Sequence, residues 1–172
     1  MNHNELLTDA FDRVRTNVRG AVKDLTASEL MARPSGVSGD GNSIAWLIWH
    51  LSRVQDDHMA KAAGTVQAYT ADGWADRFAL PFDSLDIGYG HDSAEVSAVR
   101  VESPVLLEGY YDAVHGRTLE FVRGLSVEDL DRVVDKSYVP AVTLGARIVS
   151  VIDDCIQHAG QAVYVRGLVH RG

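Results

Sequence analysis

Two residues near the C-terminus have the spacing of a metal-binding pair. Asp154 and His158 lie four positions apart in a segment with helical periodicity. Residues four apart sit one turn above each other, so both side chains project from the same helix face. A carboxylate and an imidazole in that arrangement can bind one metal ion. The same spacing also occurs in surface hydrogen-bonded pairs, so a third ligand is needed to choose between the two interpretations.

A histidine about a hundred residues upstream is the candidate third ligand. His50 lies in SIAWLIWHLSRV (43–54), on the flank of an apolar stripe. A histidine there is either a hydrogen-bonded core residue or a ligand. His58 is a rival, because its helical angle places it nearer the middle of that stripe. Trp46 falls on nearly the same side as His50, where it either walls a pocket or packs in a core or interface.

The single cysteine offers a different chemistry, which the sequence does not favour. Cys155 directly follows Asp154 and therefore points about a hundred degrees away from it. We predict a buried small hydrophobic side chain rather than a catalytic thiol. One cysteine also excludes an intrachain disulfide and zinc-ribbon chemistry.

Four long helices must position these residues. Apolar residues recur at three- and four-residue steps over about 4–25, 43–63, 104–124 and 143–168, which predicts a helix over each range. Asn42 or Ser43 suits the start of the second helix, Gly64 its end and Pro104 the first turn of the third. In the fourth helix, the residues predicted to point inward are Ile148, Val149, Ile152, Ile156, Ala159 and Val163.

The connections complete an all-α prediction. Residues 65–101 form a long link between the second and third helices, with short helices expected at 74–80 and 93–101. The segment 133–142 is broken by Pro140 and is expected to be too short to build a sheet. The fold class predicted is therefore an all-α four-helix bundle with one long connection, as a single domain over residues 1–172.

Composition and charge indicate the class of protein and the partners to expect. The 172 residues are 46% hydrophobic and 23% charged, an ordinary globular mixture. A net charge of −8 argues against nucleic acid as a partner. The sequence has no membrane-length apolar run and no N-terminal signal pattern, so the expected location is the cytoplasm. Apolar and aromatic helix residues make a homodimer through helix faces a further expectation.

Three strings, taken in order, resemble the DinB/YfiT-like superfamily. They are NSIAWLIWHLSRVQDDHM (42–59), GYGHDSAEVSAVR (88–100) and DDCIQHAGQAVYVRG (153–167). The resemblance implies a four-helix bundle with a divalent metal at one end, held by His50, Asp154 and His158. The aspartate departs from the commonest all-histidine ligand set. It is nearer the carboxylate version in mycothiol-dependent maleylpyruvate isomerase-like members.

The resemblance also implies a reaction class. Members include S-transferases and isomerases that use a low-molecular-weight thiol such as mycothiol or bacillithiol. Zinc is the expected metal, with nickel, manganese or iron as alternatives. Three protein ligands leave an open position, where a bound thiol is deprotonated. The connection 65–101, with Tyr89 and His91, is then expected to cover the second substrate.

Three alternatives remain open on the same site. The open position can activate water in a metal-dependent hydrolase. Two histidines and one carboxylate can instead form the ligand set of a non-haem iron enzyme. The third alternative is a non-enzymatic metal-binding stress protein with a structural ion.

Overall fold

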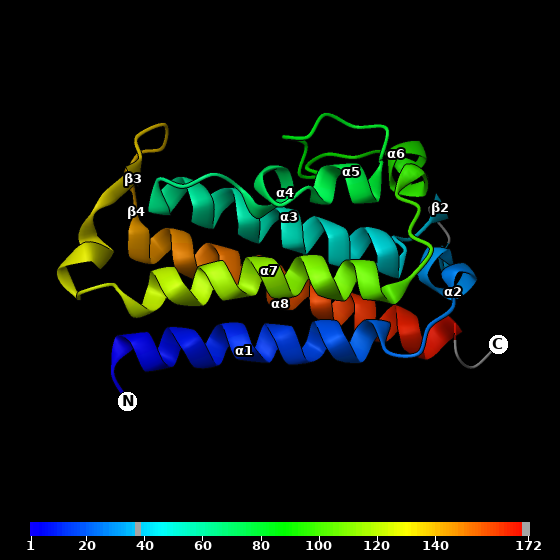
Figure 1. Ribbon diagram of the computed structural model, residues 1–172, viewed down its shortest axis with the longest axis horizontal. Helices are drawn as coiled ribbons and strands as arrows, with labels where there is room; N and C mark the ends of the chain where they lie inside the picture. Colours follow the sequence, from blue (N-terminus) through cyan, green and yellow to red (C-terminus); the bar gives the residue numbers. More distant parts are fainter. Residues whose placement is uncertain (37–38, 170–172) are drawn as a thin grey trace.

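Four long helices dominate the computed structural model, which describes residues 1–36 and 39–169. They are α1 (His3–Val22), α3 (Ile44–Ala63), α7 (Pro104–Arg123) and α8 (Leu144–Val169). Figure 1 shows them lying lengthwise beside one another, with α3 packed on α7 and α8, and α1 packed on the same two helices. The all-α prediction is confirmed, and the predicted ranges 4–25, 43–63, 104–124 and 143–168 match these helices closely.

The helix ends follow from local side-chain chemistry. The Ser43 hydroxyl accepts from the Trp46 amide at the start of α3, satisfying one of the donors that a helix N-terminus leaves free. Gly64 ends α3 with φ 71°, a left-handed conformation that suits glycine. Pro104 occupies the first turn of α7, where no intrahelical donor is lost.

The inward face of α8 agrees with the prediction only in part. Val149, Ile156 and Val163 are 43% to 63% exposed. The buried face carries Leu144, Ile148, Val151, Cys155, Ala159, Ala162 and Val165, so the prediction is confirmed for Ile148 and Ala159, and Ile152 packs partly buried against the core. Both faces of α8 are apolar, so periodicity alone cannot choose between them. The smaller residues lie inward because they let neighbouring helices approach closely.

The connection between α3 and α7 lies over α3 (Figure 1) and contains three short helices. These are α4 (Ala68–Ala71), α5 (Trp74–Phe78) and α6 (Ser93–Ala98). The expected helices at 74–80 and 93–101 therefore correspond to α5 and α6, each shorter than predicted. The long connection is structured, which fits the rarity of long irregular loops in compact domains.

Two buried charged residues of α3 hold this connection in place. The Arg53 guanidinium donates to the Asp86 carbonyl at 3.0 Å, the Ser84 carbonyl at 2.9 Å and Gln67 Oε1 at 2.7 Å. The Asp56 carboxylate accepts from the first two backbone amides of α4, each at 2.8 Å. Each buried charge is thus paired and hydrogen-bonded, as burial of charge requires.

The remaining elements are small. They are α2 (Ala27–Met31), the 3-10 helix η1 (Glu128–Asp131) and two antiparallel strand pairs, β1 (Ser35–Gly36) with β2 (Gly39–Asp40) and β3 (Val133–Asp135) with β4 (Val142–Thr143). The expectation that 133–142 builds no sheet is wrong on this point, because Val133 pairs with Thr143 and Asp135 with Val142. Pro140 does not interrupt the ladder because it lies between the strands.

None of the helices in the described part of the chain has both the length and the apolar character needed to cross a membrane.

Candidate metal centre

The structure brings together the three residues singled out from the sequence. One ligand atom from each of His50, Asp154 and His158 lies within 4.8 Å of the other two. His50 comes from α3 and the other two from α8. The two helices touch directly beside them, where the Cys155 thiol lies 3.6 Å from the Leu51 carbonyl. The i,i+4 pair is close, with His158 Nε2 3.6 Å from Asp154 Oδ1.

Hydrogen bonds to acceptors fix which ring nitrogen of each histidine faces the cluster. His50 Nδ1 lies 2.5 Å from the Ile87 carbonyl oxygen, and His158 Nδ1 lies 3.1 Å from Gln161 Oε1. Carbonyl and amide oxygens only accept, so both Nδ1 atoms carry the proton. Both Nε2 atoms then keep a lone pair for a metal. This arrangement, in which a second partner sets the tautomer, is usual for metal-ligating histidines.

The carboxylate of the cluster has an oxygen that its protein surroundings leave unsatisfied. Asp154 Oδ2 is buried and has no hydrogen-bond partner among the described residues. Such an atom is costly unless an unseen partner satisfies it. A divalent cation fits, because nitrogen and carboxylate donors lie about 2.0–2.2 Å from zinc. Donor atoms within 4.8 Å of one another need only a small contraction to share one ion.

The surroundings shift the pKa values of the two histidines in opposite directions. Burial lowers the pKa of His50, which favours the neutral form that can act as a ligand. Burial opposes protonation of His158 too, but the hydrogen bond and the charge of Asp154 outweigh it and raise the pKa of His158. Where the pH is low enough to protonate His158, a metal ion has to displace the proton on Nε2, the ring nitrogen that lies 3.6 Å from Asp154 Oδ1.

The cluster is accessible from one side. His50 is 5% exposed, whereas the side chains of His158 and Asp154 are 19% and 34% exposed. A ligand can therefore approach along α8 but not through α3. Structural zinc sites have four protein ligands, whereas catalytic zinc sites have three and leave one position open. Three donor residues with one accessible side therefore match a catalytic metal site better than a structural one.

Trp46 of α3 and the connection above that helix support His50. The Trp46 ring stacks on the His50 ring, with centroids 4.6 Å apart and an interplanar angle of 13°. Trp46 Nε1 donates to His91 Nδ1 at 3.2 Å, and His91 Nε2 donates to Asp86 at 3.1 Å. His91 is therefore committed at both nitrogens, with a side chain only 4% exposed. It supports Trp46 and is not available to cover a second substrate. Tyr89, by contrast, is 89% exposed, so its side chain is free to contact a second substrate.

Gly88 is a supporting residue that the sequence interpretation missed. Its φ is 83°, and a Cβ placed there would lie 2.9 Å from His50 Nδ1 and 2.9 Å from the Trp49 ring. The backbone that supplies the Ile87 carbonyl can thus approach His50 only because residue 88 has no side chain. The string GYG (88–90) was the available signal, since paired glycines mark tight backbone turns.

The rival residues lie outside the cluster. His58 faces a separate cavity near the β3–β4 pair. Cys155 is fully buried, as predicted, and burial raises the pKa of its thiol well above the usual value. That thiol is unsuited to be a nucleophile.

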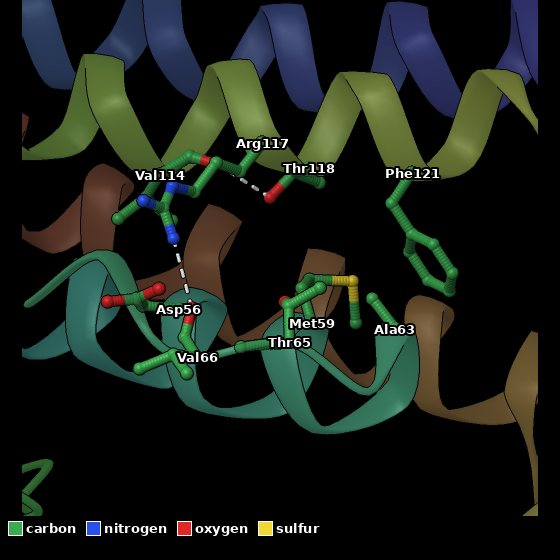
Figure 2. A pocket seen from close by; sticks show the side chains of 10 residues that line it. Asp56, Met59, Ala63, Thr65, Val66, Val114, Arg117, Thr118 and Phe121 are labelled. Atoms are coloured by element: carbon green, nitrogen blue, oxygen red, sulfur yellow. Dashed lines mark hydrogen bonds between the residues drawn. The ribbon is translucent and has the colours of Figure 1, made fainter. Parts of the chain in front are cut away.

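Another cavity, between α3 and α7, contains none of the three cluster residues (Figure 2). Its volume is about 20 Å³, room for little more than one water molecule. Its carboxylate, Asp56, already accepts the two α4 amides and the Tyr110 hydroxyl. We therefore assign no site there.

Comparisons with known proteins identify a family and a structural relative. The family model described as the DinB superfamily matches residues 10–162. A crystal structure described as a conserved protein from Enterococcus faecalis is similar to the whole chain. The identity is 30% and the TM-score 0.89, and the match covers 100% of this chain and 99% of that one. The comparison with curated proteins finds no match.

Proposed function

Since the chain belongs to the DinB superfamily, we propose that it is a divalent-metal-dependent enzyme whose ion is held by His50, Asp154 and His158. In this proposal the four long helices act as a four-helix bundle that keeps α3 and α8 in fixed register. The observation that carries it is the convergence of one ligand atom from each of the three residues, together with an Asp154 oxygen that has no hydrogen-bond partner among the described residues. Zinc is the proposed ion, because two imidazoles and one carboxylate with an open position form a common catalytic zinc set.

The proposed reaction is transfer of a low-molecular-weight thiol, of the mycothiol or bacillithiol type, onto an electrophilic small molecule, or an isomerisation using that thiol. A divalent ion in the cluster would supply the charge that keeps a coordinated thiol deprotonated near neutral pH. The nucleophile has to come from outside the chain, because Cys155 is fully buried. This supports a thiol cosubstrate over a mechanism that uses the protein's own thiol.

The roles of the protein groups follow from their contacts. The Ile87 carbonyl and the Trp46 ring hold His50 in one orientation. Gln161 orients His158 in the same way. The accessible side, beside Asp154 and His158, is where a small molecule would enter. Preorganised ligands of this kind raise metal affinity because little conformational freedom is lost on binding.

The test is a conjugation assay with a matched control. Zinc-loaded protein is incubated with a chloro-nitroaromatic electrophile and, in turn, mycothiol, bacillithiol and glutathione. We expect zinc-dependent conjugation with one thiol, lost in Asp154→Ala. It should be retained in Asp153→Ala, which removes a neighbouring carboxylate that hydrogen-bonds only Gln157 among the described residues. Equal rates with and without zinc for every thiol, together with zinc-dependent cleavage of esters or amides, would replace the transferase by a hydrolase.

A further inference from the structure

A second cavity lies farther along the same pair of helices. It is bounded by the end of α3, the start of α8 and the β3–β4 pair, and its volume is about 120 Å³. Its charged lining residues are Lys61 from α3, Arg147 from α8 and Asp135 from β3, with His58 and Tyr138 at its sides. The strand pair that the sequence did not predict thus forms one wall of a cavity.

The distance between this cavity and the metal cluster follows from helix geometry. On α3, His58 is eight residues beyond His50, and on α8, Arg147 is seven residues before Asp154. At a rise of about 1.5 Å per residue these separations are about 12 Å and about 10 Å. Seven residues are nearly two full turns, so Arg147 and Asp154 project from the same face of α8. The charge of Asp154 also acts on His58, although burial and Arg147 have larger effects and lower the pKa of that histidine.

The cavity is cationic in a protein with a net charge of −8. Its one carboxylate, Asp135, is already engaged by Arg147 at 2.9 Å and by the Ser137 hydroxyl at 2.6 Å. Within residues 1–36 and 39–169 the Lys61 ammonium group makes no hydrogen bond or ion pair, although its charge contributes to lowering the pKa of Asp135, after the hydrogen bonds from Ser137. Among the side chains that line the cavity, Lys61 and Arg147 carry two positive charges against the one negative charge of Asp135. Two cationic side chains that line one cavity of an acidic protein, one of them the exposed Lys61, are features of an anion-binding site.

We propose that this cavity binds the carboxylate of the thiol cosubstrate whose sulfur atom occupies the metal centre, an inference that rests on the proposed function. A carboxylate fits the small volume and the single excess positive charge. The planar Arg147 guanidinium also has donors beyond the one used by Asp135, in the fork geometry that carboxylates accept. The spacing of about 10–12 Å selects a thiol whose carboxylate is separated from sulfur by a chain of several atoms. The cavity thus sets which thiol is used, while the metal cluster sets the chemistry.

The test compares thiols that differ only in length and charge. The protein is loaded with Co²⁺, and thiol binding is followed by the thiolate-to-cobalt charge-transfer absorption, which requires no turnover. The probes are mercaptopropionic and mercaptooctanoic acids and the corresponding mercaptoalcohols, all with terminal thiols. We expect the long acid to bind about fivefold more tightly than the long alcohol, the gain from one partly exposed ion pair. The short acid and short alcohol should differ much less.

Two lysine variants locate the effect. Lys61→Met should remove the preference for the long acid and leave cobalt affinity unchanged. Lys23→Met removes the same charge beside Arg166 near the other end of α8 and should keep the preference. A long acid that binds no better than its alcohol, or a preference that survives Lys61→Met, overturns the carboxylate site but leaves the thiol chemistry standing. If no thiol changes the cobalt spectrum, the proposed function fails and this inference fails with it.

Discussion

Replacing Gly88 by alanine tests how the connection above α3 orients the metal cluster. Two separate costs follow from the structure. Residue 88 has φ 83°, and its Cβ would lie 2.9 Å from both His50 Nδ1 and the Trp49 ring. Gly90 has a similar φ of 77°, but a Cβ there would meet nothing within 4 Å. Gly90→Ala is therefore a matched control that carries the backbone strain without the steric clash.

The expected magnitudes separate the two variants. A left-handed conformation costs a residue with a side chain about 1–2 kcal/mol, so Gly90→Ala should lower the free energy of unfolding by that amount. Gly88→Ala should lose about 1–3 kcal/mol more, the usual cost of forcing a methyl group into a packed site. The extra loss corresponds to about 2–4 °C in melting temperature per kcal/mol for a chain of this size. Displacing the Ile87 carbonyl from His50 should also reduce zinc affinity by about 10- to 100-fold.

The assay combines urea denaturation of the metal-free proteins with calorimetric zinc titration. Gly90→Ala should bind zinc like the wild type, and Gly88→Ala should bind it much more weakly. Equal stability losses in the two variants, together with equal zinc affinities, would refute the conclusion that the backbone at residue 88 positions His50.

Three further predictions concern buried polar groups. Arg53→Met should lower the free energy of unfolding by about 3–5 kcal/mol in urea denaturation, because a fully buried cation that bridges the connection to α3 is lost; a loss below about 1 kcal/mol would contradict this. The Cys155 thiol should fail to react with an aromatic disulfide reagent in the native protein and should react fully after unfolding, since it is buried and its pKa is raised; rapid native-state reaction would show it to be accessible. Burial lowers the pKa of His115 in the folded state despite its contact with Asp12. The unfolded chain therefore takes up that proton more readily, and stability should fall as the pH drops below about 6.5, the unfolded value. His115→Asn should weaken this pH dependence, and an unchanged dependence would exclude His115 as its source.

The long helices could be predicted from the sequence because their signals are local. Three- and four-residue periodicity, the Ser43 cap and the Gly64 stop each act within one helix, and the structure places α3 accordingly. The inward face of α8 could not be predicted in the same way. Val149 and Ile156 are more hydrophobic than Ala159, but the close approach of α3 and α8 decides which face is buried.

In the candidate site, too, the residues with local sequence signals could be predicted and those positioned by tertiary contacts could not. Asp154 and His158 follow from their spacing on one helix, His50 and its rival His58 follow from their places on the apolar helix before the long connection, and the resemblance to a family selects His50. The supporting groups could not be predicted, because the Ile87 carbonyl and the contact of Trp46 with His91 depend on the path of a long connection. That path has no periodic pattern. It is set by tertiary contacts such as the hydrogen bonds of Arg53, which no local signal in the sequence reveals.

The central claim is that His50, Asp154 and His158 hold one divalent ion. The most direct test is calorimetric titration of the metal-free protein with zinc, alongside His50→Ala, Asp154→Ala, His158→Ala and His58→Ala. We expect a single equivalent to bind to the wild type and to His58→Ala, and none to the other three. Asp154→Ala and His158→Ala should melt near the metal-free wild type, because they lose only the stabilisation that binding provides. His50→Ala should fold but melt lower, because it also loses the stacking on Trp46 and the hydrogen bond to the Ile87 carbonyl. A wild-type protein that binds no zinc, or an equivalent that survives substitution of each of the three residues, would contradict the claim.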